Sequence, residues 1–369
     1  MRRAGVIPVL VSGLFVVSRS SRSAMSSSAR ECNSAASTIN STEFYATYHG
    51  HDPEHLRSLH HALSSRGATQ PRVVFFAGDS SLDNKHWLFR PSKAPNKVRR
   101  LTTRQAKSYT AAAINGYEDV LEPKRMVKDV AYWLNSCFHQ QQQEEEGTED
   151  GRSFVCINAS VEEATVADRE QQRGPDDDGL LPQDVFIRDS ITEDDVLVVS
   201  VGGNDIALHP SVATIASMAW LARLTPSWLV GYYHPAMYYF RRLFRDRVQR
   251  YVSKLVAKRK PALVLVCMVY FPLEETSGGW ADRVLGLLDY DNNPAKLQLI
   301  VRQIFEHATS AIEVEGVEAV VPVPLFDVLD STDPRDYDER VEPSVEGGRK
   351  MGRCFCDIIL NHFQGSDDV

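Results

Sequence analysis

The sequence contains few cysteines, no long apolar run and no excess of positive charge. Six cysteines in 369 residues are too few for a disulfide framework. Cys156 and Cys267 lie inside apolar runs, and Cys354 and Cys356 stand two residues apart without a second pair of metal ligands, so all four are predicted to be free thiols. No apolar run reaches the roughly 20 residues that a membrane-spanning helix needs.

The charge balance disfavours nucleic acid as a partner. The chain has 41 Lys and Arg against 49 Asp and Glu, a formal net charge of −8, whereas a generic nucleic-acid binder carries a basic face. A content of 43% hydrophobic and 24% charged residues is that of an ordinary globular protein and excludes a fully disordered chain, a collagen and a coiled coil. Neither a GxGxxG nor a P-loop motif follows the first predicted strand, which disfavours a nucleotide-binding protein.

Residues 1–45 are predicted to be a targeting segment and a linker. Residues 1–30 contain five arginines and eight serines but no acidic residue. The apolar stretch 4–17 resembles the core of a secretory signal peptide, and the Arg- and Ser-rich remainder resembles an organelle transit peptide. Residues 31–45 are rich in Ser, Thr, Asn and Ala, which is typical of a linker. Secretion, organelle import and, without targeting, a cytoplasmic location all stay open.

Apolar runs alternate with helical patterns in the remaining residues, 46–369. Strands are predicted at 73–76, 154–158, 196–201, 262–270 and 317–322. These runs are continuous, which is typical of strands covered on both faces in a parallel sheet. Helices are predicted at 51–65, 123–138, 235–258, 294–313 and 344–363. The alternation predicts one doubly wound α/β domain.

Two polar segments interrupt this pattern. Residues 139–152 are of low complexity, and residues 167–184 hold an acidic triplet and two prolines. Such compositions bury too little apolar surface to fold, so both segments are predicted to be disordered insertions on the surface.

Small, hydrogen-bonding residues follow three of the predicted strands. They are Gly78-Asp79-Ser80-Ser81, then Asn158-Ala159-Ser160, then Gly202-Gly203-Asn204-Asp205. Functional residues of doubly wound sheets gather in the loops after the carboxyl ends of the strands. Three such loops in succession therefore predict a single site at this edge of the sheet.

These blocks resemble those of the SGNH hydrolases, also called the GDSL esterase/lipase superfamily. FFAGDSSLDN contains the family's Gly-Asp-Ser, VSVGGNDIAL contains its Gly-x-Asn-Asp, and CINASVEEAT stands at its Asn-x-Gly block. The resemblance covers roughly residues 68–363 and implies a three-layer α/β/α sandwich with a five-stranded parallel, flavodoxin-like sheet. It implies cleavage of a carboxylic ester, such as an acetylated sugar or a lipid, through an acyl-serine intermediate, without a metal or cofactor.

The resemblance also implies the roles of individual residues. Ser80 corresponds to the nucleophile, and the backbone N–H groups of Ser80 and Ser160 with the side chain of Asn204 correspond to the oxyanion hole. A serine at a strand-to-helix turn presents its hydroxyl group, and an asparagine amide donates a neutral N–H to an oxyanion. Gly202 belongs to the same hole. Supporting positions are Gly78, Asp79, Asp205 and Asp338.

The family's closing Asp-x-x-His block has no histidine here. Glu339 stands at the aspartate position and Glu342 at the histidine position. A glutamate with an ordinary pKa of about 4.3 is a poor base at neutral pH. Three alternatives stay open. In the first, Glu342 acts as the base, with Glu339 or Asp338 nearby and its pKa raised by burial and like charge. In the second, His86 or His209 acts as the base instead of Glu342. The third alternative is a catalytically silent binding protein on the same fold.

A long segment, residues 208–245, connects the third and fourth predicted strands. Its part 208–240 is rich in aromatic residues, which are Trp220, Trp228, Tyr232, Tyr233, Tyr238, Tyr239 and Phe240. Three interpretations stay open: a lid or wall over the site, the packing of two helices in the core, and weak contact with a membrane surface, favoured by Arg241, Arg242 and Arg245.

Overall fold

The computed structural model describes residues 38–66, 70–89, 109–144, 153–172, 178–208 and 210–364. The predicted targeting segment and His209 lie outside these residues. No helix in the part of the chain that the structure describes is long and apolar enough to cross a membrane.

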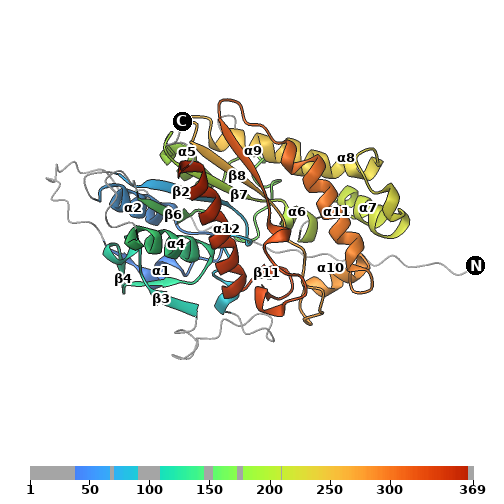
Figure 1. Ribbon diagram of the computed structural model, residues 1–369, viewed down its shortest axis with the longest axis horizontal. Helices are drawn as coiled ribbons and strands as arrows, with labels where there is room; N and C mark the ends of the chain where they lie inside the picture. The colour runs from blue at the N-terminus through green and yellow to red at the C-terminus, as the bar shows by residue number, and fades with distance from the viewer. Residues whose placement is uncertain are drawn as a thin grey trace, which may run out of the picture. The chain divides into compact units, whose positions relative to one another are not determined.

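A five-stranded parallel sheet in the order β6-β2-β7-β8-β9 forms the centre of the fold (Figure 1). The strands are β2 (Arg72–Gly78), β6 (Phe154–Asn158), β7 (Val196–Ser200), β8 (Leu263–Met268) and β9 (Ala319–Pro324). Each overlaps a run predicted to be a strand, and all four pairings are parallel, which confirms the predicted fold class.

Both faces of this sheet are buried, as the continuous apolar runs predict. In β2, Val73 and Phe75 face one apolar cluster, while Val74 and Phe76 face the other. Successive side chains of a strand point to opposite faces, so a strand between two cores needs an apolar residue at every position.

Helices cover both faces, which makes the three layers expected from the resemblance. In Figure 1, α4 and α12 lie together on one face, and α2, α5, α9 and α11 contribute to the cluster on the other. The helices are α1 (Ser41–Phe44), α2 (Pro53–Ser64), α4 (Val130–Glu144), α5 (Pro182–Ser190), α6 (Gly203–Ala207), α7 (Val212–Ala219), α8 (Pro235–Arg241), α9 (Val248–Leu255), α10 (Ala281–Leu287), α11 (Pro294–His307) and α12 (Val345–Gln364). Two π-helical turns, η3 (Trp220–Leu224) and η5 (Arg242–Arg247), extend α7 and α8, and a 3-10 turn, η4 (Ser227–Leu229), lies between them.

Three short two-stranded sheets lie outside the central one. β1 (Ile39–Asn40) pairs with β4 (Leu121–Glu122), β3 (Thr110–Ala112) with β5 (Arg125–Val127), and β10 (Tyr337–Asp338) with β11 (Glu342–Pro343).

Two predicted boundaries are wrong near these short sheets. The residues before 46 are not all linker, because 39–44 form β1 and α1, with Ile39 and Phe44 buried in the core. The helix predicted from 123 begins at Val130, since the residues before it pair in β4 and β5. Pairing with distant strands overrides the local helical pattern there.

Parts of both predicted insertions are ordered, and residues 145–152 and 173–177 lie outside the described residues. Helix α4 continues to Glu144, so 139–144 are helical. Within 167–184, helix α5 begins at Pro182, and Arg169 is fully buried because its guanidinium pairs with Asp184. A buried ion pair across the insertion is invisible to composition, which registers only the high polarity of the segment.

Candidate active site

Ser80 lies two residues after the end of β2, at the carboxyl edge of the sheet. The strand end is packed so closely that a Cβ on Gly78 would lie 2.6 Å from the carbonyl oxygen of Ser200 on β7. On the opposite side, the buried Arg169 donates from Nη2 to the Gly78 carbonyl oxygen at 2.7 Å. Only a residue without a side chain fits at position 78. The turn that carries Ser80 is therefore held firmly in place.

Asp79 and Ser81 shape the turn around Ser80. The Asp79 carboxylate accepts hydrogen bonds from the N–H and the hydroxyl of Ser81, at 3.0 and 2.7 Å. The Ser81 hydroxyl also lies 2.7 Å from that of Ser200. Burial raises the pKa of Asp79 to about 6, although the hydrogen bonds from Ser81 oppose the rise. Ser81 thus serves the turn, whereas the Ser80 hydroxyl is directed elsewhere.

The β10–β11 pair brings Glu342 to Ser80. The Ser80 hydroxyl donates to Glu342 Oε1 at 3.2 Å, and both side chains are buried. Asp338 lies directly opposite Glu342 in the antiparallel register. The turn between them contains Glu339 and Arg340, both with left-handed φ angles of 48° and 72°. The structure therefore joins two of the predicted residues, 262 positions apart in sequence, through a hydrogen bond.

The buried Arg340 anchors this turn. Its guanidinium bonds the carboxylates of Asp282 and Asp291 at 2.9 and 3.0 Å, and the carbonyl oxygen of Leu273 at 3.0 Å. A paired, hydrogen-bonded arginine tolerates burial that an unpaired one would not. The hairpin and its Glu342 are thus tied to the loop after β8 and to α10.

Glu339 does not line the cavity described below. Its carboxylate lies beside Gly279, where an added Cβ would be 3.2 Å from Glu339 Oε2. Asp338, rather than Glu339, is the cross-strand neighbour of Glu342, because register decides which residues of an antiparallel pair face each other. Burial and the charge of Glu339 raise the pKa of Asp338 to about 6.

The environment of Glu342 disfavours its charged form. Burial is the largest cause that raises its pKa well above the usual range, and the negative charge of Glu162 adds to it. Oε2 of Glu342 has no hydrogen-bond partner among the described residues, whereas the bond from Ser80 favours ionisation. The base form of Glu342 therefore appears at a higher pH than in an exposed glutamate.

Glu162, which the sequence analysis did not identify, influences the site through its charge on Glu342 and does not line the cavity. It is almost fully buried, and its Oε1 accepts a hydrogen bond of 2.8 Å from the Trp87 indole. Burial and the charge of Asp83 raise the pKa of Glu162 to about 9. Lys85, buried with Asp83 at 2.5 Å, opposes that rise. The only sequence signal was an acidic residue two positions after the second strand-exit block.

Of the predicted oxyanion-hole residues Asn204 and Ser160, only Asn204 lines the cavity. Asn204 lines the cavity, and its amide donates one hydrogen bond to the Ala164 carbonyl oxygen at 3.2 Å. An amide carries two hydrogens, so a second one stays available. The Ser160 N–H instead donates to Asn158 Oδ1 at 3.1 Å, and Ser160 does not line the cavity.

Two other predicted positions support the loops. Gly202 has a left-handed φ of 103°, and a Cβ there would lie 2.8 Å from the Phe244 ring. Asp205 accepts hydrogen bonds from the N–H groups of Val166 and Ala167, at 2.7 and 3.3 Å, which ties the segment after β6 to α6. Both residues position the loop that carries Asn204.

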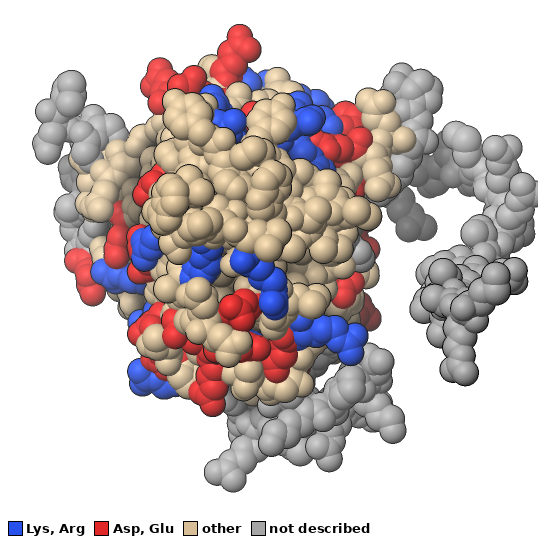
Figure 2. All heavy atoms as spheres, turned by 90° about the vertical axis from the view of Figure 1, so that its right-hand side faces the viewer, with Lys and Arg blue, Asp and Glu red and all other residues tan. Residues whose placement is uncertain are grey.

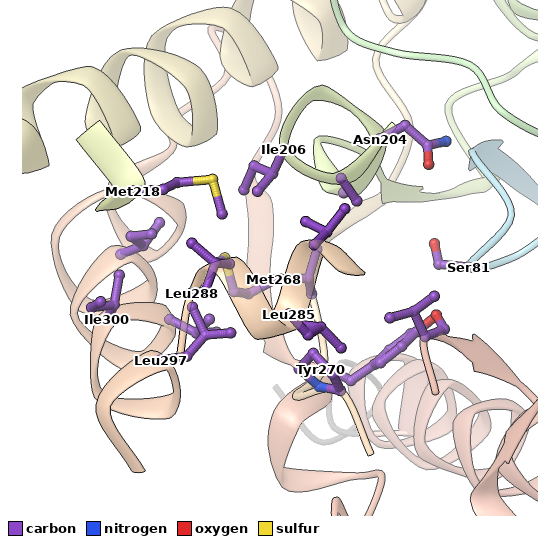
Figure 3. Close-up of a pocket in the computed structure, with 18 of the residues that line it drawn as sticks. Ser81, Asn204, Ile206, Met218, Met268, Tyr270, Leu285, Leu288, Leu297 and Ile300 are labelled. Atoms are coloured by element: carbon purple, nitrogen blue, oxygen red, sulfur yellow. The ribbon is translucent and has the colours of Figure 1, made fainter. Parts of the chain in front are cut away.

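A cavity of about 160 Å³ extends from Ser80 and Glu342 into an apolar region. In Figure 3, Asn204 and Ser81 lie at one end, and Met218, Leu297 and Ile300 lie at the other. The remaining lining residues are Asp79, Gly203, Ile206, Ala207, Ala222, Phe240, Met268, Val269, Tyr270, Pro272, Trp280, Val284, Leu285, Leu288, Val301, Ile304 and Val341. Polar groups at one end and apolar walls at the other are the usual features of a pocket for an amphipathic ligand.

None of the described histidines lines this cavity. The ring of His86 packs against that of Tyr48, with 4.3 Å between the centroids. Glu342 is thus the group that contacts the Ser80 hydroxyl within the described residues.

Comparison with known proteins finds solved structures of low overall similarity. No protein-family model and no curated protein matches the sequence. An aryl esterase from M. smegmatis is 12% identical, with a TM-score of 0.41 over 79% of this chain and 99% of its own. A carbohydrate acetylesterase from Sinorhizobium meliloti is 14% identical, with a TM-score of 0.36 over 78% and 98%. A phospholipase A1 from Streptomyces albidoflavus is 14% identical, with a TM-score of 0.35 over 79% and 99%. Values this low assign no activity to this chain.

Proposed function

We propose that this chain is a serine hydrolase of the SGNH type, which cleaves a carboxylic ester through an acyl-serine intermediate. The observation that carries the proposal is the hydrogen bond of 3.2 Å from the Ser80 hydroxyl to Glu342, at the polar end of the cavity. A nucleophile and a base within hydrogen-bond reach, beside a place for the substrate, are the minimum that acyl transfer requires.

Each residue then has a defined step. Ionised Glu342 takes the proton of Ser80 as the hydroxyl oxygen bonds to the ester carbonyl carbon. The backbone N–H of Ser80 and the amide of Asn204 donate hydrogen bonds to the oxyanion that forms. Glu342 returns the proton to the departing alcohol as the ester C–O bond breaks. It next deprotonates a water molecule, which attacks the acyl group, and finally reprotonates Ser80 as the acid leaves.

The same geometry supports a second candidate, a silent binding protein. While Glu342 is protonated it accepts no proton from Ser80, and its raised pKa extends this state to a higher pH than in an exposed glutamate. The two candidates differ in how Ser80 reacts with a fluorophosphonate, which transfers its phosphonyl group to an activated serine and releases fluoride.

Labelling of the full-length protein across pH about 5 to 10 tests the proposal, since only ionised Glu342 activates the serine. The hydrolase is expected to become labelled increasingly as the pH rises through the pKa of Glu342. A folded protein that stays unlabelled at every pH would instead be a binding protein.

Replacing Glu162 with glutamine is expected to move the rising limb of the pH–rate profile to lower pH. The charge of Glu162 raises the pKa of Glu342, and a neutral amide keeps the volume without the charge. The measurement is kcat/KM for a soluble ester against pH. Glu346→Gln, a partly exposed residue on the first turn of α12, is the control and should leave the limb unchanged. An unshifted limb in Glu162→Gln would show that Glu162 does not influence the base.

The walls of the cavity favour a long acyl group over an acetyl group. Apart from the polar residues around Ser80, the lining consists almost entirely of aliphatic, methionine and aromatic side chains, which come from α6, α7, η3, α8, β8, α10, α11 and the loops beside them. Burial of a methylene group contributes about 0.8 kcal/mol, or roughly fourfold in kcat/KM. We therefore propose a lipid-like ester, rather than an acetylated sugar, as the substrate class.

Lengthening the acyl chain from acetyl is expected to raise kcat/KM by up to roughly fourfold per methylene until the cavity is full. Ala222→Phe, which places a ring in the apolar end, should lower the optimal chain length and spare acetyl esters. Ala213→Phe, on the exposed side of α7, should leave the chain-length profile as in the wild type. Kinetics on a series of soluble 4-nitrophenyl esters provide the measurement. A flat series would contradict the assignment of the cavity to the acyl group.

A further inference from the structure

The exposed large apolar side chains of the described residues collect on one surface. Nine of the ten lie between residues 212 and 238, and the tenth is on α10. They are Val212, Ile215, Trp220, Leu224, Trp228, Leu229, Tyr232, Tyr233, Tyr238 and Leu287, and we call this set the apolar face. Figure 2 shows a broad uncharged area on this side of the molecule, with both basic and acidic residues along its margins.

The apolar face belongs to the same helices as the wall of the cavity. Met218 and Ala222 line the cavity, while Ile215 and Trp220 are about half exposed on the outer side of α7 and η3. A helix that is apolar on all sides is ordinarily covered on all sides. Exposed apolar patches of this extent mark interaction sites. The outer side of α7 and η3 therefore lacks a covering layer that its composition calls for.

The charge of this segment is opposite to that of the whole protein. Between residues 206 and 245 the sequence has four arginines and no aspartate or glutamate, although the formal net charge of the chain is −8. Arg241 lies over the Tyr232 ring, 3.9 Å from its centroid, and Arg242 lies 6.0 Å from the Tyr238 ring. The arginines thus stand directly beside exposed aromatic side chains, and a partner that covers both needs negative charge and an apolar interior.

We infer that the apolar face docks onto an anionic lipid surface, from which the cavity behind it takes its ester; the second part rests on the proposed function. Tyrosine and tryptophan favour the boundary between headgroups and acyl chains, and arginines beside them attract anionic headgroups. A second copy of the chain fits less well, because a two-fold interface would place the same arginines against one another.

The test is co-sedimentation of full-length protein with sucrose-loaded vesicles. Phosphatidylcholine vesicles with phosphatidylglycerol should bind the protein, and pure phosphatidylcholine vesicles should bind it at least about tenfold more weakly, since each arginine near an anionic surface contributes to attraction. High salt should weaken binding to the anionic vesicles, because it screens exposed charges.

Two double variants separate the apolar and the charge contributions. Trp228→Ser with Tyr233→Ser removes the side chains that are 80% and 94% exposed, and is expected to weaken binding at least about tenfold. Arg242→Gln with Arg245→Gln should weaken binding to anionic vesicles by roughly tenfold. The matched control, Arg349→Gln with Arg353→Gln, removes the same charge from the exposed side of α12 and should bind as the wild type does. Hydrolysis of a soluble short-chain ester should be unchanged in all three.

Other results would overturn the inference. The first is vesicle binding that stays intact in both the apolar and the arginine double variant. The second is absence of binding to both kinds of vesicle. The third is a dimer in sedimentation velocity that Trp228→Ser with Tyr233→Ser dissociates, while the protein binds no vesicles. Vesicle binding does not require the catalytic serine, so Ser80→Ala should bind as the wild type does. A wild-type protein that binds vesicles but is never labelled by fluorophosphonate would contradict the proposed function and leave the docking surface standing.

Discussion

Replacing Ser80 with alanine is expected to abolish fluorophosphonate labelling and to lower kcat/KM for ester hydrolysis by at least about 10³-fold. The Ser80 hydroxyl is the group that donates to Glu342 at the polar end of the cavity. Without it neither the phosphonyl nor the acyl bond forms. Because the side chain is small and its hydroxyl makes a single hydrogen bond, to Glu342, the variant should fold normally, which a thermal unfolding curve checks.

Ser81→Ala is the matched control for this prediction. Ser81 also lines the cavity, yet its hydroxyl bonds Asp79 and Ser200 rather than Glu342. We expect the variant to keep labelling and most of its activity, while its melting temperature falls because the turn loses a buried hydrogen bond. If labelling vanished in Ser81→Ala and persisted in Ser80→Ala, the nucleophile would be Ser81 and the assignment of Glu342 as its base would fail.

Replacing Glu342 with glutamine should cost about 10²- to 10⁴-fold in kcat and remove the rise of activity with pH, since an amide does not accept the serine proton. Glu339→Gln, three positions earlier and outside the cavity, should retain activity and the pH profile. Glu342→His places an imidazole with an ordinary pKa of about 6.5 beside Ser80, and any recovered activity should follow the titration of the imidazole instead of that of the carboxyl group. Equal losses in Glu339→Gln and Glu342→Gln would contradict the assigned base.

Stability measurements distinguish a lost base from a damaged fold. The pKa of Glu342 is raised in the folded protein, so its protonated form favours folding. That contribution is complete below the unfolded pKa of about 4.3 and is lost as the pH rises towards the folded pKa. Glu342→Gln lacks this titration. Its free energy of unfolding, measured by urea denaturation, should therefore exceed that of the wild type at alkaline pH even though its activity is lower.

The layered architecture was predictable because burial on both faces leaves a direct mark on sequence. Strands β2, β7 and β8 sit between two apolar clusters, so each reads as an unbroken apolar run. Errors arose where distant partners decide local structure. The residues before α4 pair with other strands, and Arg169 folds a polar insertion inwards by its bond to Asp184. None of these partners, β1, β3 and Asp184, is adjacent in sequence to the segment that it holds.

The candidate site was partly predictable, because its residues follow the strands in sequence and the carboxyl ends of parallel strands meet at one edge. Ser80 and Asn204 were found in this way. The sequence also placed Glu342 where the family has a histidine. Three features depend on tertiary structure: the Ser80 hydroxyl contacts Glu342, Asp338 rather than Glu339 lies opposite Glu342, and the charge of Glu162 raises the pKa of Glu342. Contact, register and burial depend on residues that are far apart in the chain, and a sequence pattern reports only neighbours along it.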